Sequence, residues 1–296
     1  MNSFPSTPTP TESATAVMPL DKWTVYWAWR GGLVSAFASA TGISHTVNED
    51  CCLHFPSAAA PMFCAVADGV GGGAYGEVAS HALAQHCAAA SREVYRNPAR
   101  LVAWLKQGDA VVREAIALRS DQRGASTLVA AWFLSPGKAH LSNIGDCRAY
   151  CLRPRWFGKG WHIRQLTQDQ TYANLKRNPP PGGSPGDPAC MAGVGAVGEP
   201  PVTPVSLGEG ELLLLCSDGL HKFVTDADLA TITGTGLREG LWLQAICQRL
   251  VEAAQRNGSH DDISALLVQR RHWFGARRVY WLALLAALLA VWKWLV

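Results

Sequence analysis

The sequence predicts an α+β fold in which packed β-sheets are flanked by helices. Short apolar runs rich in β-forming residues occur in both halves of the chain, and longer segments with helical spacing lie between them. Strands thus precede and follow a central helix pair instead of alternating with single helices, which disfavours a doubly wound parallel sheet. With 48% apolar and 17% charged residues in 296, the chain can fill a large core.

The expected strands are apolar runs at 62–67, 127–133, 140–144, 148–152, 211–216 and 263–269. The expected helices cover 76–96, the segment from Pro98 through Ile116, and 237–255. The segment at 178–188 is so rich in Pro and Gly that we expect a surface loop there. No internal boundary interrupts these elements, so we expect a single domain over 21–270.

Composition also limits the environment and the partners. The net charge of +3 is too small to indicate a nucleic-acid binder, and we expect no nucleic acid as a partner. The nine cysteines form no C-x-x-C pair, which favours a reduced, cytosolic body over a disulfide framework or a zinc site. Residues 1–20 are rich in Ser, Thr and Pro and lack the features of an export signal, so we expect a disordered leader.

The C-terminal segment has the composition of a membrane anchor. Residues 279–296 contain 17 apolar residues, interrupted only by Lys293. A helix of this length would span about 27 Å, close to the thickness of a bilayer core. Four arginines precede it, so we expect a basic juxtamembrane linker at 271–278, a transmembrane helix at 279–296 and the domain at 21–270 on the cytoplasmic side of the inner membrane. The alternatives are a buried C-terminal helix or an amphipathic dimer helix.

Aspartates stand at the ends of several expected strands. Asp68, Asp146 and Asp218 each follow an apolar run, and Asp261 comes just before one. Carboxylates held at one sheet edge would repel each other unless cations neutralised them, and oxygen-only sites favour Mg²⁺ or Mn²⁺ over zinc. Two such ions close together form a hydrolytic centre. For each Asp-Gly pair alone, a simple β-turn is the competing interpretation.

In order along the chain, seven segments resemble the metal-dependent Ser/Thr protein phosphatases of the protein phosphatase 2C family. The matching segments are NED at 48–50, DGVGG at 68–72, GAST at 124–127, NIGDCRAY at 143–150, LTQD at 166–169, LLLCSDGL at 213–220 and HDDIS at 260–264. The resemblance implies a sandwich of two antiparallel sheets flanked by helices. It also implies a site at one edge for two Mn²⁺ or Mg²⁺ ions, to which bacterial members add a third, weaker ion.

The resemblance also implies a role for each acid. Asp68 would bridge both metals, and the Gly69 carbonyl would bind one of them. Asp218 and Asp261 would bind the other. Glu49 and Asp50 would hold metal or its waters, and Asp146 together with Asp218 would hold the third, weaker ion.

The implied reaction is direct attack of a metal-bridging hydroxide on phosphoserine or phosphothreonine, without a phosphoenzyme. The implied partner is a phosphorylated protein, such as a cognate Ser/Thr kinase or the targets of that kinase.

Several positions depart from the family pattern. His45 stands where members commonly place a phosphate-binding Arg; it is either an ordinary polar residue or a weaker phosphate contact. Gln170 replaces a usual His beside Asp169, and Val70 stands where animal members carry a His thought to act as the acid. Asp262 replaces a usual Asn. These departures leave room for a pseudophosphatase acting as a regulatory binding module at the membrane. A different two-metal phosphoesterase is a third possibility.

Five other histidines share no metal-binding spacing, and we expect them to be structural: His81, His86, His140, His162 and His221.

Overall fold

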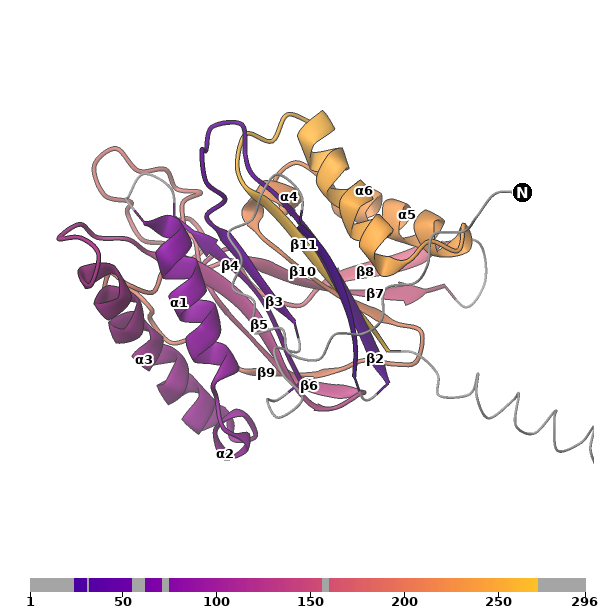
Figure 1. The fold of residues 1–296 in the computed structure, drawn as a ribbon, viewed down its shortest axis with the longest axis horizontal. Coiled ribbons are helices and arrows are strands. Elements are labelled where there is room, and N and C mark those ends of the chain that lie inside the picture. The colour runs from indigo at the N-terminus through magenta and orange to yellow at the C-terminus, as the bar shows by residue number, and fades with distance from the viewer. Residues whose placement is uncertain (1–23, 31, 55–61, 71–74, 156–159, 271–296) are drawn as a thin grey trace, which may run out of the picture.

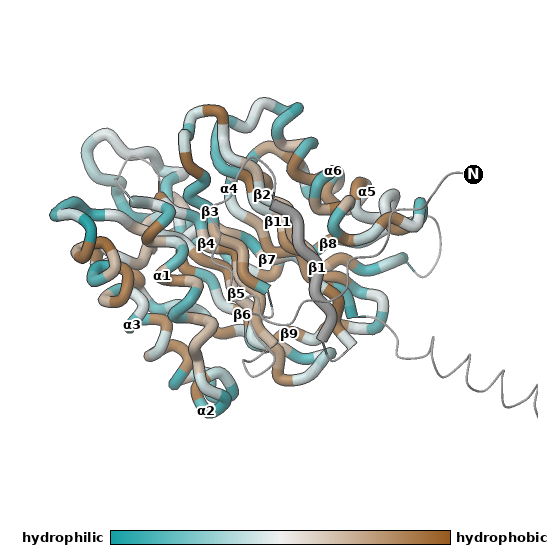
Figure 2. The backbone as a smooth tube through the Cα atoms, in the orientation of Figure 1, coloured by the Kyte–Doolittle hydropathy of each residue, from teal (hydrophilic) through white to brown (hydrophobic). Residues whose placement is uncertain are grey.

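A computed structural model describes residues 24–30, 32–54, 62–70, 75–155 and 160–270. Two antiparallel β-sheets lie face to face, and helices cover the outer face of each sheet, which gives four layers (Figure 1). The predicted α+β sandwich is therefore confirmed. In Figure 2 the apolar stretches follow the strands and the helix faces turned toward them.

The first sheet has six strands in the order β1-β2-β11-β10-β7-β8. Its strands are β1 (Thr24–Arg30), β2 (Leu33–Ala40), β7 (Arg148–Pro154), β8 (Trp161–Gln165), β10 (Leu212–Cys216) and β11 (Ile263–Arg270). The second sheet has five strands in the order β3-β4-β5-β6-β9. Its strands are β3 (Asp50–His54), β4 (Met62–Gly69), β5 (Ser126–Ser135), β6 (Lys138–Ile144) and β9 (Thr203–Ser206).

The helices divide between the two outer faces. Those beside the five-stranded sheet are α1 (Gly76–Ala88), α2 (Arg92–Tyr95) and α3 (Pro98–Ala117), and those beside the six-stranded sheet are α4 (Asp218–His221), α5 (Asp226–Arg238) and α6 (Leu243–Arg256). Asn97 caps α3 by accepting hydrogen bonds from the backbone N–H groups of Ala99 and Arg100. Pro98 at the first helical position confirms the predicted start.

Strand alternation creates three apolar cores. Along β10, Leu212, Leu214 and Cys216 pack against α4–α6, whereas Leu213 and Leu215 face the other sheet. A third core lies between the five-stranded sheet and α1–α3, where Trp132 is fully buried and its indole N–H donates to the Cys87 carbonyl at 3.1 Å. Because both faces of each sheet are covered, the central strands read as continuous apolar runs.

Two helix predictions need correction. The segment predicted as one helix over 76–96 forms α1 and α2, with a break at 89–91. The helix predicted over 237–255 is wrong at its start, because α5 ends at Arg238 and a turn through Gly240, with φ +75°, separates it from α6. The segment at 178–188 contains no helix or strand, as predicted.

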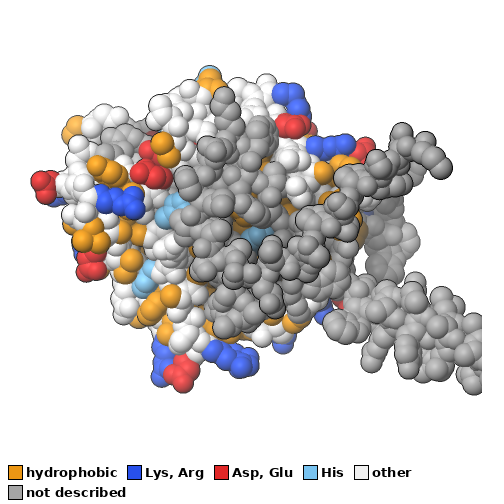
Figure 3. Space-filling model, viewed as in Figure 1, with side chains coloured by type: hydrophobic (Ala, Val, Ile, Leu, Met, Phe, Trp, Pro, Cys, Tyr) orange, Lys and Arg blue, Asp and Glu red, His pale blue; other side chains and the backbone are white. Residues whose placement is uncertain are grey.

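All nine cysteines are buried, and none of them forms a disulfide. In the described part of the chain, no helix is long and apolar enough to cross a membrane. The predicted leader at 1–20, the basic linker at 271–278 and the anchor at 279–296 lie outside the described residues. On the face seen in Figure 3, the acidic and basic side chains of the described residues occur in small mixed groups near the outline of the molecule.

Candidate metal centre

Two of the predicted acids face each other directly across a strand pair. Asp50, at the start of β3, is the cross-strand partner of Asp68, near the end of β4. Like charges opposite each other destabilise a sheet. Asp50 is fully buried, and its Oδ2 accepts a hydrogen bond from the Ser217 hydroxyl at 2.8 Å, whereas its Oδ1 has no hydrogen-bond partner. The repulsion within this pair must therefore be offset by a proton or by a bound cation.

The other acids reach the same edge from turns and strand ends. Asp146 lies in the turn that joins β6 to β7, Asp218 begins α4 two residues after β10, and Asp261 lies two residues before β11. Gly145 makes the β6–β7 turn with φ +89°, and its N–H donates to Gln170 Oε1 at 2.9 Å. Gln170 thus supports the turn that carries Asp146.

The pKa shifts show that these carboxylates influence one another. Burial raises the pKa of Asp68, and the charges of Asp218, Asp50, Asp146 and Asp261 raise it further. Burial, followed by the charge of Asp218, raises the pKa of Asp146 to about 7 despite the opposing effect of Lys222. The pKa of Asp261 is raised by burial and by Asp218. The structure thus brings together the acids that the sequence predicted for one site.

The donor atoms fit hard divalent cations. Besides Asp50 Oδ1, Glu49 Oε2 and Asp218 Oδ1 are buried without a hydrogen-bond partner, and Asp146 Oδ2 has no hydrogen bond but lies 3.4 Å from the Lys222 ammonium. Unpartnered carboxylate oxygens in an oxygen-only set suit Mg²⁺ or Mn²⁺, and cations would offset the repulsion described above. Among the described residues, no three His, Cys, Asp or Glu side chains are already gathered into a metal cage.

Two glycines allow the backbone to pack closely at this edge. A Cβ atom on Gly69 would lie 2.4 Å from the Gly76 carbonyl oxygen, and one on Gly76 would lie 2.5 Å from Glu49 Oε2. The N–H of Gly69 donates to the Glu49 carbonyl at 3.1 Å. Because no side chain fits at either position, the start of α1 can approach β4 and the Glu49 carboxylate.

Asp262 organises the loop that carries His45 and Glu49. Its carboxylate accepts hydrogen bonds from the Gly42 N–H at 2.7 Å, the Glu49 N–H at 2.6 Å and His45 Nδ1 at 2.9 Å. Its side chain is only 3% exposed. The sequence marked Asp262 as a departure from the family pattern, but it could not predict this anchoring role, because the loop and β11 are distant along the chain.

His45 lies next to the acids, with Nδ1 4.0 Å from Asp261 Oδ1. Burial would lower the pKa of His45, but the hydrogen bond to Asp262 and the charges of Asp262, Asp261 and Glu49 outweigh burial and raise it. The ring is thus placed where it can contribute positive charge, as a phosphate contact requires.

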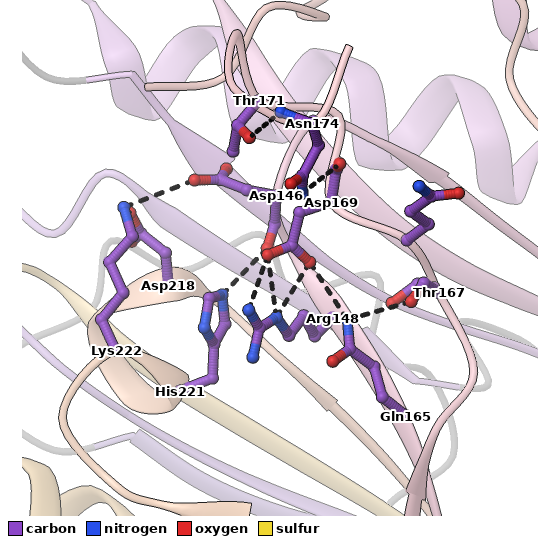
Figure 4. Close-up of polar contacts among 12 residues, drawn as sticks. Asp146, Arg148, Gln165, Thr167, Asp169, Thr171, Asn174, Asp218, His221 and Lys222 are labelled. Atoms are coloured by element: carbon purple, nitrogen blue, oxygen red, sulfur yellow. Dashed lines mark hydrogen bonds and ion pairs between the residues drawn. The ribbon is translucent and has the colours of Figure 1, made fainter. Parts of the chain in front are cut away.

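A second polar network supports Asp146 (Figure 4). His221 Nε2 lies 2.9 Å from the Asp146 carbonyl oxygen. Because a carbonyl only accepts, the neutral ring must carry its proton on Nε2. Burial and the neighbouring Arg148 lower the pKa of His221 to about 4, so the ring is neutral at pH 7. Arg148 in turn binds Asp169 through Nε and Nη2 at 2.8 and 2.6 Å. His221 is therefore structural, as predicted, but it also holds the backbone of a site residue.

Replacing Asp146 with Asn is expected to stabilise the metal-free protein at pH 8. Burial raises the pKa of Asp146 from its ordinary value of 3.8 to about 7 in the folded chain, so the folded state retains a proton that the unfolded state loses. The free energy of unfolding therefore falls as pH rises from about 4 to 7. We expect the melting temperature of Asp146→Asn in chelator to exceed that of the wild type by about 3 °C or more at pH 8, and by much less near pH 4.5. An equal difference at both pH values would contradict this assignment.

The chain is similar to protein phosphatases of a single family. Residues 42–268 match protein phosphatase 2C. The serine/threonine protein phosphatase PstP of Mycobacterium tuberculosis is 27% identical over 244 residues, which cover 78% of this chain and 44% of PstP. The serine/threonine phosphatase stp of Listeria monocytogenes is 27% identical over 219 residues, covering 69% of this chain and 83% of stp. The chain thus matches less than half the length of PstP.

Solved structures agree with this assignment. The catalytic domain of PstP in complex with two manganese ions superposes with a TM-score of 0.61 and 28% identity, covering 81% of this chain and 99% of that domain. The family match begins after β1 and β2 and includes the remaining strands of both sheets and the edge where the carboxylates converge. The chain belongs to the protein phosphatase 2C family.

Proposed function

We propose that this chain hydrolyses phosphoserine and phosphothreonine on proteins and requires Mn²⁺ or Mg²⁺ to do so. The observation that carries this proposal is that Asp50 faces Asp68 across a strand pair, at the edge where the charges of Asp50, Asp146, Asp218 and Asp261 all raise the pKa of Asp68. Such a cluster is stable with cations and costly without them. The presence of all five acids weighs against a pseudophosphatase that serves only as a binding module.

Each acid has a position suited to this role. Asp68 would be shared by two ions, the Gly69 carbonyl and the Glu49–Asp50 pair would serve one side, and Asp218 and Asp261 would serve the other. When bound, the ions would lower the pKa of water and offset the charge of the phosphate. His45 is held by Asp262 beside Asp261, where its ring can donate a hydrogen bond to a phosphate oxygen.

Phosphate release from a phosphothreonine peptide tests this proposal. We expect turnover by the full chain with Mn²⁺, none with a chelator, and loss of turnover in Asp218→Asn. If calorimetry shows that Mn²⁺ binds and no phosphate is released, the pseudophosphatase replaces the enzyme. A panel of phosphoserine, phosphotyrosine and small phosphate esters distinguishes a protein phosphatase from another two-metal phosphoesterase.

We also propose that residues 279–296 anchor the domain to a membrane, with the domain on the cytoplasmic side. The support is the sequence alone: 17 of 18 residues are apolar, and arginines at 270, 271, 277 and 278 precede them. An anchor would confine the enzyme near membrane-bound kinases or their targets and raise its effective concentration there.

Truncation after Arg271 tests the anchor. We expect the full chain to sediment with membranes and the truncated chain to remain in the supernatant. Sedimentation of the truncated chain with membranes would contradict the proposal, and alkaline carbonate washing of the full chain separates insertion from surface binding.

A further inference from the structure

Lys222 makes contacts that an ordinary surface lysine does not make. It lies one helical turn after Asp218, and its Nζ is 2.6 Å from Asp218 Oδ2 and 3.4 Å from Asp146 Oδ2 (Figure 4). Asp146 and Asp218 are 2% and 14% exposed, respectively, whereas Lys222 is 45% exposed. The ammonium therefore approaches the carboxylate cluster from its solvent side and bridges two acids supplied by different elements.

The surrounding structure fixes this position. The Lys222 N–H donates to the Asp218 carbonyl at 3.0 Å, and the preceding His221 is bonded to the Asp146 carbonyl. Leu220 and Val224 are buried on either side. These contacts hold α4 against the β6–β7 turn and so fix the point from which the Lys222 side chain starts, within reach of both acids.

The contacts differ from those of the chain's exposed ion pairs. Lys106 binds Glu199 at the surface, where both side chains are well exposed, and such pairs contribute little. The acids bound by Lys222 are buried, and removing an ammonium from buried carboxylates leaves charge uncompensated. Another cation would then be favoured in its place.

We propose that Lys222 acts as a built-in cation for Asp146 and Asp218, so that the centre of this protein holds two divalent ions and excludes a third. The inference rests on the proposed function, since it concerns the same carboxylates. An ammonium that occupies the facing oxygens of both acids blocks their use by another ion sterically and repels it electrostatically. Lys222 thereby sets how many metal ions the site binds.

Mn²⁺ stoichiometry of the full-length protein tests this proposal without any substrate. Equilibrium dialysis, or calorimetry in parallel, should give two Mn²⁺ ions per wild-type chain and a third, weaker one in Lys222→Met. Lys222→Arg keeps the charge and should bind two. Lys106→Met, which removes a lysine from an exposed ion pair, is the matched control and should also bind two.

A second variant tests the inference should Lys222→Met fail to fold. If Asp146 is bound to the ammonium rather than to metal, Asp146→Asn should still bind two Mn²⁺ ions. Three ions on the wild type, two on a folded Lys222→Met, or loss of one ion from Asp146→Asn would each overturn the proposal while leaving the phosphatase intact. A wild type that binds no Mn²⁺ would overturn both this inference and the proposed function.

Discussion

Replacing Asp68 with Asn is expected to reduce Mn²⁺-dependent phosphate release by at least about 100-fold. Loss of a residue that merely supports a metal ligand already costs about 10–100-fold. Asp68 faces Asp50 across a strand pair, and the charges of four other acids raise its pKa. The measurement is kcat/KM for a phosphothreonine peptide at saturating Mn²⁺, together with the dissociation constant for Mn²⁺.

Stability distinguishes this effect from simple misfolding. Because Asn removes the charge that faces Asp50 across the strand pair, the metal-free variant should melt at the same temperature as the wild type or higher. Asp121→Asn, which changes an exposed acid, is the matched control and should leave both activity and melting unchanged. Near-normal turnover by a folded Asp68→Asn variant would contradict the assignment of Asp68 as a metal ligand.

Replacing Asp262 with Ala is expected to lower the free energy of unfolding by about 3–5 kcal/mol. The change leaves several hydrogen-bond donors without the buried carboxylate that accepts from them in the wild type. The backbone N–H groups of Gly42 and Glu49 and the His45 ring all lose their acceptor. Activity should fall as well, since the loop that places His45 and Glu49 is released. Chemical denaturation, with activity measured well below the transition, separates the two effects.

Two comparisons define the role of Asp262. Asp262→Asn retains one acceptor oxygen and should show a smaller loss of stability than Asp262→Ala. Asp121→Ala, at an exposed acid, should change the free energy of unfolding by less than about 0.5 kcal/mol. An Asp262→Ala variant as stable as the wild type would show that the three contacts do not hold the loop.

The strands that were predictable are those with an unbroken apolar run. β4, β5, β10 and β11 are covered on both faces, and their sequences are therefore continuous apolar runs that can be recognised as strands. β2 has serines among small residues, and β8 and β9 are short edge strands whose polar sequences resemble loops. α5 was missed because its sequence, which includes TITGTG, combines β-branched residues with glycine, both of which lower intrinsic helix propensity.

In the candidate site, too, some features could be predicted from the sequence and others could not. The order of the acidic motifs was readable in the sequence, and the structure places Asp50 opposite Asp68 and brings Asp146 and Asp218 to them. The roles of Asp262 and Lys222 depend on contacts between distant segments. The sequence analysis did not single out Lys222: its i,i+4 spacing allows it to reach Asp218, but only the packing of α4 on the β6–β7 turn brings it to Asp146 as well.

The most direct test of the central claim is to measure bound Mn²⁺ and phosphate release in the same samples of the full chain. A metal-free preparation is titrated with Mn²⁺ in the presence of a phosphothreonine peptide. If the carboxylate cluster is a metal-dependent phosphatase centre, release should be absent without metal and should rise in step with occupancy until two ions are bound. Phosphate release in chelator, or full occupancy without any release, would contradict it.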